Sequence, residues 1–122
     1  MKILIVDDSR AMRMIVRRTL RQAGIEGQSV REAENGKEAL ELMVAEMPDL
    51  VLCDWNMPVM SGIELLETLK AQGVQVPFGF VTSQNTPAMK ERARQAGAWF
   101  VISKPFTPDT FQAVLGRLQS AA

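Results

Sequence analysis

Short runs of apolar residues alternate along this chain with longer segments in which apolar residues recur at helical spacing. Continuous apolar runs are typical of strands buried on both faces, and helical periodicity is typical of the helices that cover such strands. Helices between successive strands imply right-handed crossovers, and therefore an α/β fold with a doubly wound parallel sheet. The pattern predicts strands at 3–6, 28–33, 49–53, 77–81 and 99–102 and helices at 10–23, 36–46, 62–71, 87–96 and 108–119.

The predicted helix at 10–23 has a clear apolar face. Most of its arginines fall on the opposite side, and we interpret them as a solvated helix face, with a partner-facing basic surface as the alternative. The arginines are Arg10, Arg13, Arg17, Arg18 and Arg21, and the residues expected to face the sheet are Met12, Ile15, Val16, Leu20 and Ala23.

Local motifs mark two helix starts and one close contact. Thr86–Pro87 and Thr107–Pro108 each combine a capping hydroxyl with a proline suited to the first helical turn. They predict where the last two helices begin. Gly79 is unusual inside a strand, and we expect a helix to pack closely against it.

The composition limits the size and the surroundings of the protein. At 122 residues and 47% hydrophobic, the chain has the size of one domain, which we assign to residues 1–122. Fourteen acidic residues balance fourteen basic ones, so the charge favours neither nucleic acid nor a membrane as partner. Cys53 is the only cysteine and ends an apolar run, which excludes an intrachain disulfide and indicates a reducing, cytoplasmic location.

Polar residues whose side chains can bind ligands or react stand at the ends of four predicted strands. Asp7 and Asp8 follow the first strand, Asp54 follows the third, Thr82–Ser83 follows the fourth, and Lys104 comes just after the fifth. In an open parallel sheet the functional crevice lies beyond the carboxyl ends of the strands, where the strand order reverses. We therefore expect these side chains to converge on one pocket.

Three carboxylates in one pocket repel one another unless they are protonated or bridged by a hard cation, for which Mg²⁺ is the natural candidate. Phosphate oxygens commonly complete such a site, and Lys104 and Thr82 are suited to bind them. One carboxylate could then act as nucleophile and form an acyl phosphate, but the spacing leaves open which one. Taken singly, each residue also fits a plainer role as a helix cap, a strand end or a solvated side chain.

Four motifs together resemble those of response-regulator receiver domains. They are Asp7–Asp8, the stretch from Cys53 through Gly62, Val81–Thr82–Ser83, and Lys104–Pro105–Phe106. The resemblance covers essentially the whole chain. It implies a flavodoxin-like fold, with five parallel strands in the order 2-1-3-4-5 and five helices.

The resemblance also implies which residues bind the metal and the phosphoryl group. Asp54 would accept a phosphoryl group from a sensor histidine kinase. Asp8 and Asp54 would bind Mg²⁺ together with the backbone carbonyl of Asn56, and Asp7 would act through a bound water. The domain would catalyse its own phosphorylation and its later hydrolysis.

Further roles are implied around the phosphoryl group. Lys104 would pair with it, Thr82 would move toward it on activation, and the backbones of Trp55 and Ser83 would bind its oxygens. Positive charge on the metal and the lysine would stabilise the transferring group.

Two residues fall where the family tunes the access of hydrolytic water. They are Asn56 and Gln84, which are equally well explained as exposed loop residues. At Val101 the family commonly places an aromatic residue that swings inward on activation, and valine cannot do so. Trp99 and Phe100 do not replace that switch, because alternate residues on a strand point to opposite faces. We expect them in the core, and the alternative is that they anchor a partner.

The leading hypothesis is a single-domain, monomeric signalling switch with a role in chemotaxis or motility. Its downstream protein target would bind the surface formed by the helix at 87–96, the strand at 99–102 and the helix at 108–119. An alternative is a phosphate sink or phosphorelay intermediate without its own conformational output, which Val101 mildly favours.

Two other classes fit the sequence less well. A small Mg²⁺-dependent phosphohydrolase with an aspartyl phosphate expects an alternating Asp-x-Asp and a substrate-covering insertion, whereas Asp7 and Asp8 are adjacent. A flavin carrier expects a glycine- and hydroxyl-rich phosphate loop after the first strand, where the two aspartates would instead repel phosphate.

Overall fold

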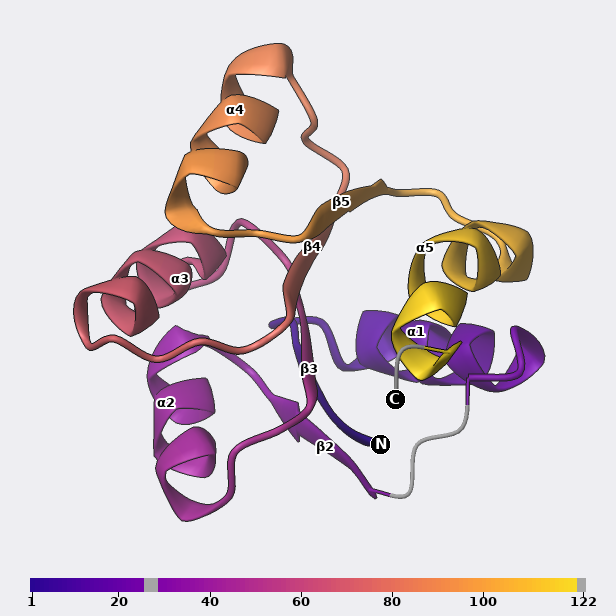
Figure 1. Ribbon diagram of the computed structural model, residues 1–122, viewed down its shortest axis with the longest axis horizontal. Helices are drawn as coiled ribbons and strands as arrows, with labels where there is room; N and C mark the ends of the chain where they lie inside the picture. Colours follow the sequence, from indigo (N-terminus) through magenta and orange to yellow (C-terminus); the bar gives the residue numbers. More distant parts are fainter. Residues whose placement is uncertain (26–28, 121–122) are drawn as a thin grey trace.

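Strands and helices alternate strictly through the computed structural model, which describes residues 1–25 and 29–120 (Figure 1). The strands are β1 (Lys2–Val6), β2 (Ser29–Ala33), β3 (Leu50–Cys53), β4 (Phe78–Thr82) and β5 (Phe100–Ser103). The helices are α1 (Arg10–Gln22), α2 (Gly36–Ala45), α3 (Gly62–Ala71), α4 (Pro87–Ala96) and α5 (Pro108–Ser120).

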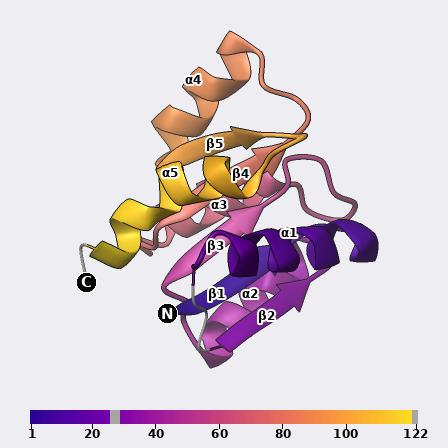
Figure 2. The same ribbon diagram turned by 90° about the vertical axis from the view of Figure 1, so that its right-hand side faces the viewer.

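The five strands form one parallel sheet in the order β2-β1-β3-β4-β5. Helices α2, α3 and α4 cover one face of the sheet, and α1 and α5 cover the other (Figures 1 and 2). The chain moves outward from β1 to β2 and then returns to the other side of β1 as β3. The switch point predicted from the sequence therefore lies between β1 and β3, and the predicted doubly wound, flavodoxin-like fold is confirmed.

The three central strands, β1, β3 and β4, bury both of their faces. Leu4 and Val6 of β1 pack into the core beneath α2, α3 and α4, whereas Ile3 and Ile5 pack into the core beneath α1 and α5. Because both faces are covered, no position in the middle of the sheet requires a polar side chain. The unbroken apolar runs in the sequence follow from this arrangement.

The predicted element boundaries agree closely with the observed ones. The bounds of α3 and α4 match, and the other described strands and helices differ by about a residue at either end, which is the usual uncertainty of helix and strand ends. The predicted start of the second strand, residue 28, lies outside the described residues. The hydroxyl of Thr86 accepts a hydrogen bond from the Met89 N–H, and that of Thr107 accepts one from the Thr110 N–H, as the capping motifs predict.

The predicted inner face of α1 is wrong at two positions. Ile15 is 45% exposed, whereas Arg13 is buried with Val16 and Leu20. The buried stripe is rotated toward Arg13 because Glu32 of β2 neutralises the arginine from the neighbouring strand. The sequence pattern of α1 alone does not show that partner.

The predictions for Gly79 of β4 and for Trp99 are also wrong. A Cβ on Gly79 would lie 1.9 Å from Cε2 of Phe100, so the close neighbour is the ring of the paired strand and not a helix. Phe100 is partly buried against the core beneath α1 and α5. Trp99, expected in the core, is 60% exposed because it precedes β5 instead of lying within it.

Candidate functional site

Three aspartates meet at the carboxyl ends of β1 and β3. One carboxylate oxygen from each of Asp7, Asp8 and Asp54 lies within 4.8 Å of the others. Asp7 is buried, Asp54 is partly buried and Asp8 is exposed, so the cluster opens to solvent on one side. The convergence of the three residues expected from the strand ends is confirmed.

The carboxylate of Asp7 is held from two sides. Its Oδ1 accepts a hydrogen bond of 2.9 Å from the backbone N–H of Ser9, and its Oδ2 accepts one of 3.1 Å from Lys104. The backbone carbonyl of Asp7 accepts a third hydrogen bond, of 2.6 Å, from the guanidinium of Arg13. Neither Ser9 nor Arg13 was predicted from the sequence to belong to this site.

Lys104 is the cation that faces this cluster among the described residues. Its ammonium lies 3.1 Å from Asp7 Oδ2 and 3.5 Å from Asp54 Oδ2, and the side chain is 16% exposed. The backbone N–H of Lys104 donates to the carbonyl of Thr82, which anchors the lysine beside β4. One positive charge therefore stands between two carboxylates.

The carboxylate of Asp54 is oriented by the chain itself, since its Oδ1 accepts a hydrogen bond of 2.7 Å from the Trp55 N–H. Burial raises the pKa of Asp54 above its ordinary value; the ammonium of Lys104 and the Trp55 N–H oppose the rise, and the charge of Asp7 adds to it. Burial also raises the pKa of the neighbouring Cys53 thiol, with further contributions from Asp54 and Asp7. The thiol is buried and donates to the carbonyl of Asp54, so the sequence prediction of a buried free cysteine is confirmed.

The raised pKa of Asp54 predicts a pH-dependent cost to stability in Mg²⁺-free buffer. A carboxyl group with a raised folded pKa stabilises the protein fully below its unfolded pKa, and that contribution is lost as the pH rises through the folded pKa. At neutral pH the ionised Asp54 is therefore destabilising, and Asp54→Asn should raise the melting temperature.

Thermal unfolding measured from acid to neutral pH in the presence of a chelator checks this prediction. The gain from Asp54→Asn should grow as the pH rises above 3.8 and then level off. Asp109→Asn is a suitable control, because Asp109 is exposed in the first turn of α5 and should give no such gain. Equal melting temperatures for Asp54→Asn and wild type at neutral pH would contradict the prediction.

The loops after β3 and β4 touch at the edge of the pocket. Thr82 is buried, and its hydroxyl accepts a hydrogen bond of 3.2 Å from the Gln84 N–H. The side chain of Gln84 in turn accepts one of 2.8 Å from the amide of Asn56. The two predicted tuning residues are therefore hydrogen-bonded to each other, while the side chain of Ser83 is exposed.

The predicted switch position lies beside these loops. Val101 is partly buried and packs against the core beneath α2, α3 and α4, next to Phe80 of the paired strand. The amide of Asn85 donates to the hydroxyl of Ser103, which ties the loop after β4 to the end of β5. This contact was not predicted from the sequence, because neither residue stands out by type or spacing.

The loop between β3 and α3 is shaped by one glycine. The N–H of Gly62 donates to the carbonyl of Trp55, and a Cβ on Gly62 would lie 2.1 Å from the backbone carbonyl oxygen of Asp54. The ring of Trp55 is buried and lies 4.8 Å from that of Phe80, measured between centroids. The start of α3 is thus packed directly behind the aspartate.

The same loop contains a strained residue, Val59. The Met60 N–H donates to the carbonyl of Pro58, closing a three-residue turn, and Val59 at its centre has φ 69°. This conformation is unfavourable for a β-branched residue, and the side chain gains little from packing because it is 76% exposed.

Val59→Gly should therefore stabilise the protein by about 1 kcal/mol, since glycine adopts positive φ without strain. Denaturant unfolding measures the change. The matched control is Val44→Gly, at an exposed position inside α2, where glycine should instead destabilise the helix by about 0.5 kcal/mol. A loss of stability in Val59→Gly would show that the turn is not strained.

The donor set of the aspartate cluster fits a hard divalent cation. Carboxylate oxygens are preferred by Mg²⁺, which keeps several waters and needs few protein ligands. The cluster supplies three carboxylates, and Lys104 compensates only one negative charge. The excess negative charge and the open side at Asp8 both suit a partly hydrated ion.

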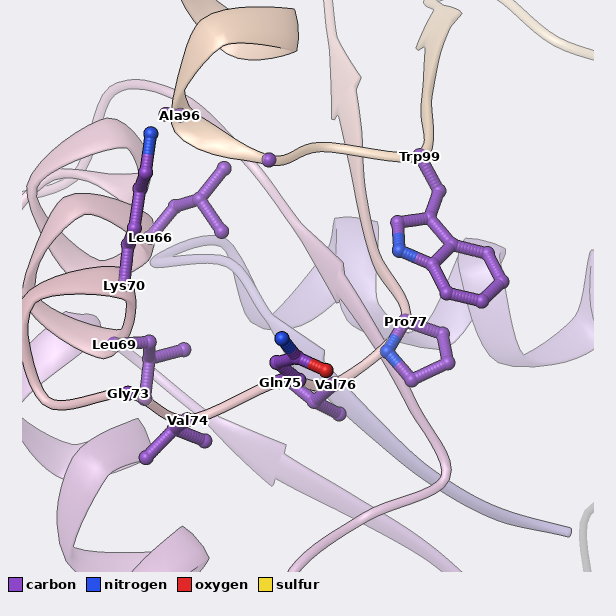
Figure 3. A pocket seen from close by; sticks show the side chains of 11 residues that line it. Leu66, Leu69, Lys70, Gly73, Val74, Gln75, Val76, Pro77, Ala96 and Trp99 are labelled. Carbon is purple, nitrogen blue, oxygen red and sulfur yellow. The ribbon is translucent and has the colours of Figure 1, made fainter.

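A hollow with different chemistry lies at the other end of the sheet. It has a volume of about 550 Å³ between the ends of α3 and α4, with Leu66, Leu69 and Trp99 among the residues that line it (Figure 3). No carboxylate is among its lining residues, so it lacks the metal-binding donors of the aspartate cluster. Within the described residues, we find no helix with both the length and the apolar character needed to span a membrane.

The chain belongs to the family of response regulator receiver domains, whose family model matches residues 3–116. The match runs from β1 into α5 and includes every residue of the pocket described above. It confirms the resemblance drawn from the four sequence motifs. The chain is therefore a response regulator receiver domain, which belongs to two-component, phosphorylation-based signalling.

Similar proteins point to a narrower group within the family. The chain is 40% identical over 115 residues to the chemotaxis protein CheY1 of Helicobacter pylori, an alignment that covers 92% of this chain and 91% of that protein. It is 39% identical to the CheY homolog of Campylobacter jejuni, covering 92% and 87%. The solved structure of chemotaxis protein CheY4 of Vibrio cholerae is 35% identical with a TM-score of 0.82, covering 95% of this chain and 96% of that one.

Proposed function

We propose that this protein is a phosphorylation-dependent switch in which Asp54 accepts a phosphoryl group from the phosphohistidine of a sensor kinase. The observation that carries the proposal is the position of Lys104, whose ammonium lies between Asp7 and Asp54 in a cluster of three carboxylates. A fixed cation next to a partly buried carboxylate is what a transferring phosphoryl group requires.

In the transfer step, an oxygen of Asp54 attacks phosphorus and forms an O–P bond. The N–P bond of the phosphohistidine breaks, and the electron pair stays on the histidine nitrogen. Lys104 offsets negative charge on the phosphoryl oxygens, and the Trp55 N–H keeps the carboxylate in place. In the later hydrolysis step water attacks phosphorus, the O–P bond to Asp54 breaks with its electron pair staying on the carboxylate, and phosphate is released.

The residues assigned to Mg²⁺ are Asp8, Asp54 and the backbone carbonyl of Asn56, with Asp7 acting through a water. The contacts of Asp7 support this division, because its carboxylate oxygens already accept hydrogen bonds from Ser9 and Lys104. When bound, the ion supplies further positive charge near the phosphoryl oxygens.

Activation is assigned to Thr82 and the loop that follows it. The Thr82 hydroxyl accepts from the Gln84 N–H, so its own hydrogen is available to a phosphoryl oxygen, with the backbones of Ser83 and Trp55 as further donors. Asn56 and Gln84 would tune hydrolysis, because their hydrogen bond lies at the edge of the pocket and restricts the approach of water.

The output would be binding of a downstream protein to the surface formed by α4, β5 and α5. Trp99 is the most exposed aromatic residue beside this surface. The similarity to chemotaxis proteins of Helicobacter and Campylobacter supports a role in chemotaxis or motility. We assign the protein to the cytoplasm as a monomer without nucleic-acid or membrane partners.

Intact mass spectrometry after incubation with Mg²⁺ and acetyl phosphate tests the proposal. Wild type should gain one phosphoryl group, and neither Asp54→Asn nor wild type in a chelator should gain one. Asp49→Asn is the control. Asp49 directly precedes β3, at the end of the strand opposite to Asp54, and its carboxylate accepts a hydrogen bond from the Lys2 N–H. Failure of wild type to gain a phosphoryl group, even from a competent histidine kinase, would overturn the proposal.

Val101 supports a second candidate, a phosphate sink or relay intermediate, because valine cannot act as a swinging aromatic. In that case the phosphoryl group would return rapidly to a kinase or pass to a second histidine domain. Phosphorylation would then leave the affinity for any third protein unchanged. Transfer kinetics with radiolabelled phosphate and purified histidine domains distinguish this candidate from the switch.

A further inference from the structure

Arg13 is a buried cation directly behind the aspartate cluster. Its side chain is 9% exposed and reaches from α1 toward the end of β1. One guanidinium nitrogen donates to the backbone carbonyl of Asp7 at 2.6 Å, and Nε donates to Oε1 of Glu32 at 2.8 Å. Arg13 therefore joins the loop that carries the two aspartates to the edge of β2.

The contact is directed at one peptide group. The carbonyl of Asp7 belongs to the peptide bond that links Asp7 to Asp8. A charge-assisted hydrogen bond to this carbonyl fixes the plane of the peptide, and the plane sets the direction in which the Asp8 side chain leaves the chain. The carboxylate of Asp7 is fixed separately, by Ser9 and Lys104.

Glu32 is needed to keep Arg13 in this position. A buried guanidinium is costly unless it is paired, and Glu32 supplies the charge. Arg17 binds the other oxygen of Glu32 at 2.8 Å and the carbonyl of Val30, and in the described part of the chain no hydrogen bond or ion pair joins it to Asp7. Among the described residues, two arginines therefore bind the same carboxylate, and of these two it is Arg13 that is hydrogen-bonded to the aspartate loop.

We infer that Arg13 is a positioning residue that sets the affinity of the aspartate cluster for a divalent cation, with Glu32 holding it in place. The inference rests on the proposed function, since it assigns a role toward the cation of that site. Arg13 acts on the ligands through the Asp7–Asp8 peptide and touches neither the ion nor the phosphoryl group. Loss of a residue that orients metal ligands commonly weakens metal binding by 10–100-fold.

The plainer explanation is that Arg13 only fastens α1 to β2. The two explanations differ in what they predict for the folded variant. If the arginine only links α1 to β2, its loss lowers the melting temperature in a chelator but leaves the Mg²⁺ dissociation constant of the folded protein unchanged. If it orients the aspartates, the dissociation constant rises as well.

Calorimetric titration with Mg²⁺ alone, paired with thermal unfolding in a chelator, tests the inference. Arg13→Met should bind Mg²⁺ about tenfold more weakly than wild type. Arg13→Lys should also bind more weakly, because a single ammonium does not reproduce the fork of a guanidinium. Arg17→Met is the matched control: it removes the other arginine on Glu32 and should leave the Mg²⁺ affinity unchanged.

A second readout uses the phosphorylation reaction. In Arg13→Met the Mg²⁺ concentration that gives half-maximal adduct formation should rise about tenfold, while the rate at saturating Mg²⁺ stays close to that of wild type. If Arg13→Met fails to fold, Arg13→Lys and Glu32→Gln are titrated in its place, since both retain a polar group at the contact between residues 13 and 32.

The outcomes separate the inference from the proposed function. If wild type binds Mg²⁺ and the folded Arg13 variants bind it equally well, the inference is overturned and the proposed function stands. An equal loss of affinity in Arg17→Met would also overturn it, because the effect would then come from Glu32 and not from the contact with Asp7. If wild type binds no Mg²⁺, both fail.

Discussion

Gly62→Ala is expected to destabilise the protein by about 3 kcal/mol and to disturb the phosphorylation site at the same time. A Cβ at this position would lie 2.1 Å from the backbone carbonyl oxygen of Asp54 and 3.0 Å from the sulfur of Cys53. Neither neighbour can move freely, because Asp54 directly follows a central strand and Cys53 is buried within it. The clash is relieved only by shifting the aspartate or the start of α3.

Denaturant unfolding and the rate of acetyl phosphate labelling measure the two effects of Gly62→Ala. The control is Gly116→Ala in α5, where the nearest atom to the new Cβ is Nε2 of Gln112, at the end of a flexible side chain. Alanine is a better helix former than glycine, so this variant should be neutral or gain up to about 1 kcal/mol. A Gly62→Ala protein with the stability and labelling rate of wild type would show that the loop is looser than described.

Lys104→Met is expected to have the second large effect, on both stability and labelling. It removes the ammonium between Asp7 and Asp54 and leaves two largely buried carboxylates without a counter-charge. Loss of one partner of a buried ion pair commonly costs about 3 kcal/mol. Removing a fixed charge that stabilises the transition state should slow labelling about 100-fold.

The stability loss in Lys104→Met should depend on conditions in a defined way. It should be greatest at neutral pH without Mg²⁺, and should shrink as the pH falls and the carboxylates become protonated. Adding Mg²⁺ should also restore part of it, because the ion supplies positive charge to the same cluster. Unfolding by urea across pH, with and without Mg²⁺, provides the measurement.

Lys37→Met serves as the control for Lys104→Met, since Lys37 is exposed on α2 and faces no carboxylate in the described contacts. It should change neither stability nor labelling appreciably. If Lys104→Met labelled at the wild-type rate, Lys104 would have no part in the transfer, and the proposed chemistry would need another cation.

The sequence was sufficient to predict the fold and the meeting of Asp7, Asp8, Asp54 and Lys104. Apolar runs bounded by polar residues mark the ends of parallel strands, and those ends necessarily lie at one edge of the sheet. The order of the strands came from the resemblance to a family and not from periodicity. Their exact bounds shifted slightly because strand ends depend on pairing with neighbours.

The wrong and missing predictions have one cause. The neighbours of a side chain belong largely to segments that are distant in the sequence. Arg13 resembles the four other arginines of its helix in sequence, and only the position of Glu32 on β2 makes it a buried residue. Trp99 reads as part of an apolar run, but β5 starts one residue later and leaves its ring exposed. The contact of Asn56 with Gln84 joins two loops and has no sequence signature.

The contact between Gly79 and Phe100 restricts how this sequence can change over time. A larger residue at 79 collides with the ring, and a smaller residue at 100 leaves a gap beside the strand. Neither position can be replaced freely before the other, so an exchange of large and small residues between β4 and β5 must pass through an intermediate size at 100, such as leucine. Related chains should therefore carry one bulky residue at this pair of positions and never two.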